Sequence, residues 1–381
     1  MRILTLPLSL VLIFLVLADG FESIIQPRRV TRRYRWTRIY YLSVWRIWRF
    51  VACWIGPGKR QTGFLAAFGP LSLIGVFISW VAGLILGFAM LDWSISEAIH
   101  NPDGVTTFFT YLYLSGTTFF TLGYGDVTPA TPIGRALAVG ESGLGFGFLA
   151  VMISYLPVLF QAYSRREASI ALLDARAGSP PSASELLARM ARAGNLHLID
   201  PFLSEWEKWS ADLLESQLSF PVLGYYRSQH DNQSWLAAMT AIMDSCAFLM
   251  VQVKGINSYQ AQVTFAIARH AAVDLGLVLR TSVALPEGDR LPSEQLKWMR
   301  QRLHEAGIEL NEESAAEAKL RELRSMYEPF VQALSVRLLL NLPPFVSQQS
   351  TPDNWQRSAW MKPAPGIGNL PSVGGDEGHF A

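Results

Sequence analysis

Apolar runs separated by polar and basic segments occupy the first half of the chain. Residues 70–91 carry no charged side chain and residues 133–162 carry only two, so each run is long enough to cross a bilayer as a helix. A third run, residues 3–18, is shorter than the roughly 20 residues that a spanning helix needs. The apolar, threonine-rich segment 106–120 is too short to span. The pattern predicts an all-α membrane protein whose two long helices flank one short helix.

Basic residues predict the topology. A dense basic segment follows the first run, and no lysine or arginine then appears from residue 61 to 134. The positive-inside rule places the basic segment in the cytoplasm, together with Arg165 and Arg166 after the last run, so the C-terminus is expected to be cytoplasmic. Residues 3–18 fit a secretory signal, with Arg2 before them and Ala18 at their end, or an uncleaved membrane helix. A basic segment retained inside favours the helix.

Residues 37–55 predict an aromatic-rich helix with arginines on one side. At 100° per residue these arginines share one narrow arc, which fits either a voltage sensor or a helix lying on the inner leaflet. A sensor repeats charge every third residue within a spanning apolar helix, so the interfacial interpretation is favoured, with tryptophans at headgroup depth. The arginines are Arg28, Arg35, Arg38, Arg46, Arg49 and Arg60, and the tryptophans are Trp36, Trp45, Trp48 and Trp54.

The second half of the chain is predicted to be a helical domain. Ser179-Pro180-Pro181 breaks the chain, Ser182 with Glu185 forms a capping-box pattern, and apolar residues recur at helical spacing to about residue 342. The tail is rich in Pro, Gly and Ser and is predicted to be disordered. The expected organisation is a membrane helix or signal (1–20), a basic interfacial segment (21–63), two long helices that flank a short one (64–167), a helical cytoplasmic domain (168–345) and the tail (346–381).

Composition excludes several classes of protein. The net charge is about +1, so no nucleic-acid partner is expected, and two distant cysteines give neither a disulfide framework nor a metal-binding spacing. No G-x-G-x-x-G follows a strand, so a Rossmann-like regulatory domain is not expected. The order His197, His230-Asp231, Asp274 fits metal-dependent phosphohydrolases weakly. Helix caps and a buried His270–Asp274 pair one turn apart explain these residues better.

The segment from Thr121 to Asp126 carries the chemistry. Stripping water from K⁺ requires replacement oxygens, and consecutive backbone carbonyls supply them only if the backbone alternates between left- and right-handed dihedrals. Gly123 and Gly125 permit that alternation because they lack a Cβ. Thr121 adds a hydroxyl at the cavity end, and the preceding short helix directs its negative carbonyl end toward the cation.

Thr121-Leu122-Gly123-Tyr124-Gly125-Asp126 resembles the filter of the potassium channel family, and the resemblance covers residues 69–167. It implies a bacterial-type, two-helix pore in the inner membrane that conducts K⁺ passively, with K⁺ held by the carbonyls of Thr121, Leu122, Gly123 and Tyr124. It implies no cofactor. One filter strand cannot surround an ion, so a homotetramer is expected within the lipid bilayer. Phe120 departs from the family, which often has a second threonine at that position.

Two residues of the last helix are further candidates. The resemblance makes Gly145 a gating hinge, although a packing glycine fits equally well. Glu141 is an ionisable group at membrane depth and therefore needs partners. It either lines the cavity or supports the filter from behind. In the second position, which is favoured, it bonds hydroxyls such as Thr117 or Thr118 on the short helix before the filter, which is called the pore helix below. Asp126 is expected to support the filter as well.

Three classes of function remain. A potassium channel is favoured over a non-selective cation channel and over a receptor or enzyme with a vestigial pore. The first two share one fold and differ only in how the filter treats Na⁺. The helical domain is expected to regulate the pore in response to a ligand that the sequence does not identify.

Overall fold

The computed structural model describes residues 2–24, 26, 35–95, 98–102, 104–229, 232–283, 288–311 and 313–347. It divides into a membrane unit, formed by Met1–Arg165 with Glu215–Arg227, and a helical unit, formed by Arg166–Leu214 with Ser228–Ala381. The chain therefore passes between the units three times. Arg28, Arg29, Arg32 and Arg33, the His230–Asp231 pair and the predicted disordered tail from residue 348 onward lie outside the described residues.

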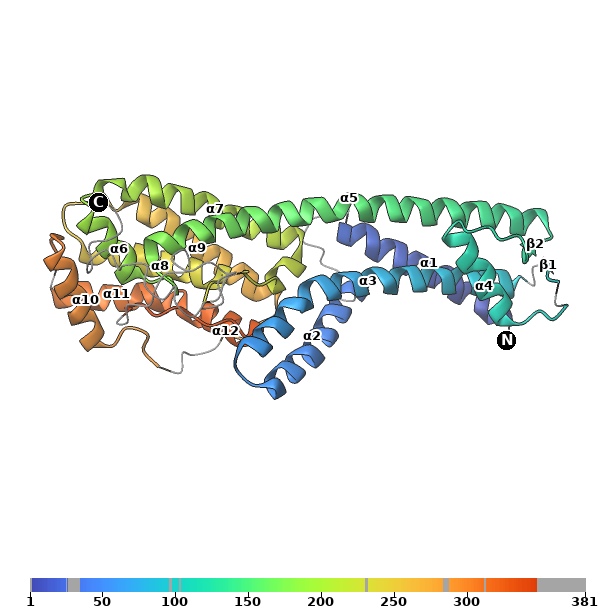
Figure 1. Cartoon of the computed structure of the whole chain (residues 1–381), viewed down its shortest axis with the longest axis horizontal. Coiled ribbons are helices and arrows are strands. Elements are labelled where there is room, and N and C mark those ends of the chain that lie inside the picture. The colour runs from blue at the N-terminus through green and yellow to red at the C-terminus, as the bar shows by residue number, and fades with distance from the viewer. Residues whose placement is uncertain are drawn as a thin grey trace, which may run out of the picture. The chain divides into compact units, whose positions relative to one another are not determined.

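The membrane unit contains the predicted helices, and several run further than their apolar cores. The predicted spans 70–91 and 133–162 lie inside longer helices, which continue into polar sequence at their ends (Figure 1). The short helix matches its prediction closely. The elements are α1 (Arg2–Ile24), α2 (Trp36–Ile55), α3 (Lys59–Ser94), β1 (Ile99–His100), α4 (Phe108–Phe119), β2 (Thr128–Pro129) and α5 (Pro132–Ala177). The antiparallel pair β1–β2 was not predicted.

Helix α1 lies along α3 in a groove made by small residues (Figure 1). Gly83 and Gly87 are one turn apart on α3, and a Cβ at either position would meet Val16 at 2.9 Å or Ile13 at 2.6 Å. Small residues at this spacing let two membrane helices approach closely. The first apolar run is therefore a helix with a fitted partner in the membrane unit.

A buried carboxylate joins α1 to its two neighbours. Asp19 accepts hydrogen bonds from Trp80 Nε1 on α3 at 2.8 Å and from the backbone N–H of Thr37 at 3.0 Å. Arg35 lies 3.8 Å from the same carboxylate. Because the carboxylate faces the N-terminus of α2, it also complements the positive end of that helix dipole.

The predicted arginine arc ends earlier than expected. Helix α2 stops at Ile55, and the following turn contains Gly56 at φ 78° and Gly58 at φ 145°. Arg60 therefore lies on α3 and does not share a helix with the other arginines. Glycine tolerates positive φ, and this turn folds α2 back against the first turns of α3.

The four tryptophans of this region are not equivalent, and their headgroup depth stays a prediction. Trp45 is buried against Phe68, with ring centroids 4.7 Å apart, and Trp48 stacks on Phe64 at 4.4 Å. Trp45 belongs to the core of the membrane unit, and Trp48 is half-buried beside it. The opposite face of α2 exposes Trp36, Ile39, Ile47, Phe50 and Trp54. That face keeps the composition of an interfacial helix.

The helical unit is built around one central helix, α8. Four helices of the described chain are apolar enough to cross a membrane, namely α1, α3, α5 and α8, but α8 is enclosed by α6, α9, α11 and α12. A helix that is hydrophobic all round belongs in a core. The elements after α5 are α6 (Ala183–Arg192), η1 (Leu196–Leu198), α7 (Ile199–Ser219), η2 (Pro221–Tyr225), α8 (Trp235–Gln252), α9 (Tyr259–Val278), α10 (Ser293–Glu305), α11 (Ser314–Ser325) and α12 (Glu328–Leu338).

A buried ionic network holds this unit together. Asp244 on α8 is fully buried, pairs with Arg290 at 2.7 Å and accepts a hydrogen bond from Tyr327. Arg290 also reaches Glu328 at 3.3 Å, and Arg324 bonds the same carboxyl at 3.0 Å. Burial opposes the charge on Arg290, but Asp244, Tyr327 and Glu328 together outweigh it and raise the pKa of Arg290 above its ordinary value. The network thus links α8, α11 and α12.

Candidate ion filter

Helix α4 delivers the candidate filter strand. The backbone N–H of Thr107 donates to Thr110 Oγ1 at 3.0 Å, which caps the start of the helix. At the other end, the N–H groups of Thr121 and Leu122 donate to the carbonyls of Thr118 at 3.0 Å and Thr117 at 2.8 Å. The strand therefore starts directly from the last turn of α4. Thr117 supports it through its backbone, since its hydroxyl bonds Leu114 within the helix.

The backbone of the strand alternates in the sense that the sequence predicts. Thr121, Gly123 and Gly125 have φ values of 57°, 59° and 77°, whereas Leu122 and Tyr124 between them do not have positive φ. Regular alternation of this kind turns successive carbonyl groups toward the same side. Thr121 adopts it despite its β-branched side chain, for which positive φ is unusual. This geometry is the central feature of the site.

The strand has little cover within its own chain. Leu122 is 53% exposed and Tyr124 is 68% exposed. Packing of both side chains away from the carbonyls would brace the filter. In a single chain nothing covers these two large side chains fully, so the packing would have to come from another molecule.

A hydrogen bond connects the outer end of the strand to the pore helix. Tyr113 donates from its hydroxyl to Asp126 Oδ2 at 2.8 Å. This bond is the main cause of a pKa for Asp126 below the ordinary value. The sequence analysis identified Asp126 but not Tyr113, because the two residues are thirteen positions apart and no local pattern predicts their hydrogen bond.

Glu141 lies on the pore-helix side of α5. It is only 2% exposed and accepts a hydrogen bond from Ser115, which is itself fully buried on α4. Ser115 is also 2.8 Å from the carbonyl of Ile85 on α3, so its position joins three helices. The predicted hydroxyl partners were Thr117 and Thr118. The partner is Ser115, two to three residues closer to the start of α4, because α5 meets the pore helix at that level.

Gly145 lies against the last residue of the pore helix. A Cβ at this position would collide with the carbonyl oxygen of Phe119, the last residue of α4. The absence of a side chain therefore has a packing reason here. Its role as a gating hinge stays a prediction.

The residues that suggested a metal-dependent phosphohydrolase do not form a site in the described part of the chain. No group of three His, Cys, Asp or Glu side chains there could hold a metal ion. His197 contacts the carbonyl of Gly194, and Asp274 is 3.7 Å from His270. His270 is 58% exposed, so this pair is not buried as predicted.

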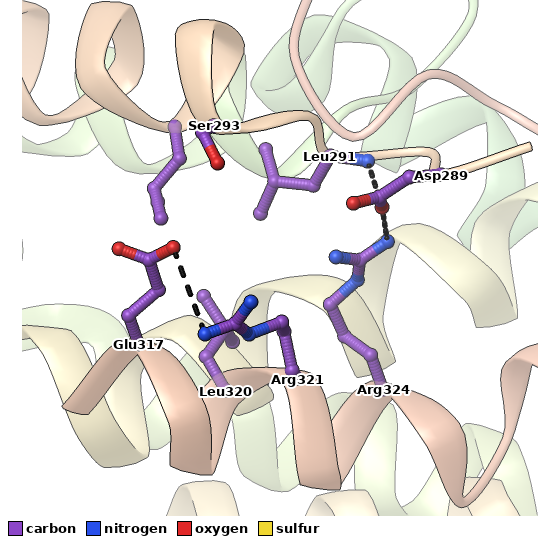
Figure 2. Close-up of a pocket in the computed structure, with 8 residues that line it drawn as sticks. Asp289, Leu291, Ser293, Glu317, Leu320, Arg321 and Arg324 are labelled. Carbon is purple, nitrogen blue, oxygen red and sulfur yellow. Dashed lines mark hydrogen bonds and ion pairs between the residues drawn. The ribbon is translucent and has the colours of Figure 1, made fainter. Parts of the chain in front are cut away.

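A small cavity lies in the helical unit between α10 and α11 (Figure 2). Its volume of about 30 Å³ matches one water molecule. The charged groups around it are already paired, with Arg324 2.5 Å from Asp289 and Arg321 4.0 Å from Glu317. It therefore gives no site for the expected regulatory ligand.

These features define a membrane protein in which two long apolar helices flank a short helix and an extended strand. The chain belongs to the ion channel family, whose model matches residues 73–162, within the range of the resemblance. It is a channel and not an enzyme. LctB of Bacillus caldotenax and LctB of Geobacillus stearothermophilus are each 33% identical to it over 94 residues, which cover 22% of this chain and 69% of the relative.

A third relative extends beyond the pore. The uncharacterized membrane protein YdjJ of Bacillus subtilis is 23% identical over 217 residues, which cover 55% of this chain and 62% of the relative. No solved structure is significantly similar to the chain. The relatives and the apolar helices agree that this is a membrane protein.

Proposed function

We propose that the protein is the subunit of a potassium-selective channel that conducts K⁺ passively as a homotetramer. The observation that carries the proposal is the alternation of positive φ at Thr121, Gly123 and Gly125. In this proposal the carbonyls of Thr121, Leu122, Gly123 and Tyr124 replace the hydration shell of K⁺. Thr121 adds its hydroxyl at the inner end.

Four copies are needed because one strand offers carbonyl oxygens from a single side. The exposure of Leu122 and Tyr124 supports this, since a neighbouring copy would cover them. Helix α5 supports it too, because its outward face carries large apolar side chains over most of its length. These include Val139, Phe146, Ile153 and Phe160. A helix with so much uncovered apolar surface packs either against lipid or against another subunit.

Two contacts support the filter from behind. The bond from Ser115 to Glu141 ties α5 to the pore helix, and the bond from Tyr113 to Asp126 ties the pore helix to the outer end of the strand. A filter of flexible carbonyls selects between ions only if its surroundings hold it in place. Glu141 and Asp126 are therefore assigned to filter support, and Gly145 remains the candidate for a hinge.

The topology follows from the basic residues. Lys59 and Arg60 begin α3, and Arg165 and Arg166 lie beyond the apolar part of α5, which places both ends inside. The loop with β1 and β2 then lies outside, and the helical unit lies in the cytoplasm of a bacterial cell. Its proposed role is to regulate the pore.

The test is a reversal potential in mixed ions. The full chain is reconstituted in vesicles or planar bilayers with K⁺ on one side and Na⁺ on the other. A potassium channel gives a reversal potential close to the K⁺ equilibrium potential. A reversal near zero would instead show a non-selective cation channel with the same fold. Chemical cross-linking of the reconstituted protein should give a ladder that ends at four subunits.

A further inference from the structure

We propose that residues 220–227, named here the aromatic clamp, transmit movements of the helical unit to the inner end of the pore. The proposal rests on the channel function proposed above. It concerns a segment that no pattern in the sequence singled out and that lies far from the filter along the chain.

The position of the clamp along the chain is the first reason. Helix α7 begins in the helical unit, but its last residues from Glu215 belong to the membrane unit, as does everything to Arg227. Ser228 returns the chain to the helical unit. The clamp is therefore a loop of the membrane unit whose two ends both continue into the helical unit, so a displacement of that unit pulls on it directly.

The clamp contacts helix α3, the first of the two long pore helices, at a glycine. Tyr226 covers Gly69 on α3 so closely that a Cβ at Gly69 would lie 2.6 Å from its ring. Tyr225 packs beside it on Phe68, with ring centroids 5.0 Å apart. Both tyrosines are buried. Such contacts between rigid rings and backbone are lost steeply when the surfaces separate.

The same segment holds the interfacial helix. Tyr225 lies 4.9 Å from Trp45 and stacks on Tyr41 at 6.3 Å with an angle of 10° between the ring planes. Trp45 and Tyr41 both lie on α2, at the level where α2 packs on α3. The clamp thus contributes, with Phe68, to the burial of Trp45.

The inner helix α5 is the third partner. Phe220 meets Tyr155 edge to face at 5.2 Å, and Tyr163 donates from its hydroxyl to the carbonyl of Arg227 at 3.1 Å. Val222 and Leu223 complete an apolar core with Leu159, among other residues. Because that core also contains Phe119, the last residue of the pore helix, it reaches from the clamp to the start of the filter strand.

The clamp thus fixes the distance between α5 and α3 on the cytoplasmic side of Gly145. Helix α5 cannot shift there without separating close-packed rings, so the clamp is either engaged or released and not continuously stretched. The helical unit shifts the equilibrium between the engaged and the released clamp. A ligand of the helical unit, or any other change in that unit, acts on the pore through this equilibrium.

Helix α7 would transmit a displacement of the helical unit to the clamp. It is anchored to α9 by a bond from Thr264 Oγ1 to the carbonyl of Leu203 at 3.0 Å and by one from Gln260 to Glu207 at 2.7 Å. Both anchors lie in the helical unit, in the same helix that ends at the clamp. Breaking these two hydrogen bonds would change the force that α7 exerts on the clamp, without altering any residue of the clamp.

The experiment measures single-channel open probability and the K⁺/Na⁺ permeability ratio in the same bilayers. Gly69→Ala places a methyl group under Tyr226, and its matched control is Gly63→Ala on the same helix, where a Cβ meets nothing within 4 Å. We expect Gly69→Ala to change open probability about two- to thirty-fold, the range of known coupling effects, with an unchanged permeability ratio. Gly63→Ala should change neither quantity.

A second experiment tests whether α7 transmits movements of the helical unit to the clamp. Thr264→Val removes one of the two anchors of α7, and it should change open probability in the native background but much less when combined with Gly69→Ala. An equal factor in both backgrounds would overturn the proposal, and so would Gly69→Ala behaving like Gly63→Ala. A native channel that passes Na⁺ as readily as K⁺ would overturn the proposed selectivity only, because open probability is measured with either ion.

Discussion

The filter strand and the ionic network of the helical unit solve opposite problems. The strand exposes its large side chains and has strained backbone, and in the proposed tetramer other copies would surround it. The network buries Asp244 completely and satisfies it within one chain. Under that proposal the filter depends on assembly, whereas the helical unit carries its own core. Stability and ion selectivity should therefore respond to different substitutions.

The largest expected effect is on the filter. Gly123→Ala introduces a Cβ at φ 59°, which costs about 1–2 kcal/mol per subunit and so about 4–8 kcal/mol in a tetramer. No atom of the same chain lies within 4 Å of that Cβ, so strain and not collision is the cause. K⁺ current should be lost while the assembled protein remains. Gly116→Ala on the pore helix, which also meets nothing, is the control.

Full K⁺ current through Gly123→Ala would remove the filter assignment. Equal losses of current in Gly116→Ala would point to misfolding of the pore helix instead. Gel filtration of both variants in detergent separates these cases, because the assembled size should be the same as in the native protein.

The ionic network should give the next largest effect, confined to the other region. Arg290→Met leaves Asp244 buried without its cation, which costs about 3–5 kcal/mol. Thermal unfolding of the helical unit should move to lower temperature, and the permeability ratio should not change. Lys297→Ala breaks an exposed pair with Glu294 at 3.3 Å and should cost less than about 1 kcal/mol. Similar losses for both variants would contradict the burial argument.

Glu141 sharpens the comparison because it is a buried carboxyl inside the membrane unit. Glu141→Ala removes the bond between α5 and Ser115, although Ser115 keeps the carbonyl of Ile85, and should destabilise the filter by about 0.5–1.5 kcal/mol, seen as faster loss of current under sustained K⁺ flow. Glu141→Gln keeps an acceptor without the charge and should conduct nearly normally. If Gln lowered single-channel conductance as much as Ala, a charge facing the cavity would explain the residue better.

The smallest effect concerns acid. Tyr113 lowers the pKa of Asp126 below its ordinary value of 3.8, so the stabilisation is present above pH 3.8 and is lost as pH falls through the lowered pKa. Tyr113→Phe removes the donor, so acid should disrupt the outer end of the filter at a higher pH. K⁺ current measured while the outer solution is titrated toward about pH 3 tests this. Tyr259→Phe, on an exposed tyrosine of the helical unit, should leave the titration unchanged.

What the sequence could predict was local. The two spanning helices, the short helix and the dihedral alternation from Thr121 to Gly125 follow from patterns within a few residues of each other. The partner of Glu141, the bond from Tyr113 and the burial of Trp45 depend on which helix faces which, and that is decided by tertiary packing. Residues 220–227 read as an ordinary loop between helices, since their partners are as far away as Tyr41 and Gly69.

The groove at Gly83 and Gly87 has a consequence for how the protein is made. A chain that enters the membrane N-terminus first has placed α1 there before α3 leaves the ribosome. The face of α1 that fits the groove is then already in the membrane, so α1 can cover α3 without the help of another membrane protein. A bulky residue at Gly87 would displace Ile13, now 2.6 Å from the place of a Cβ, and leave α3 unshielded during insertion. We expect such a variant to be less stable and to accumulate less in cells, so its defect would show in cellular abundance.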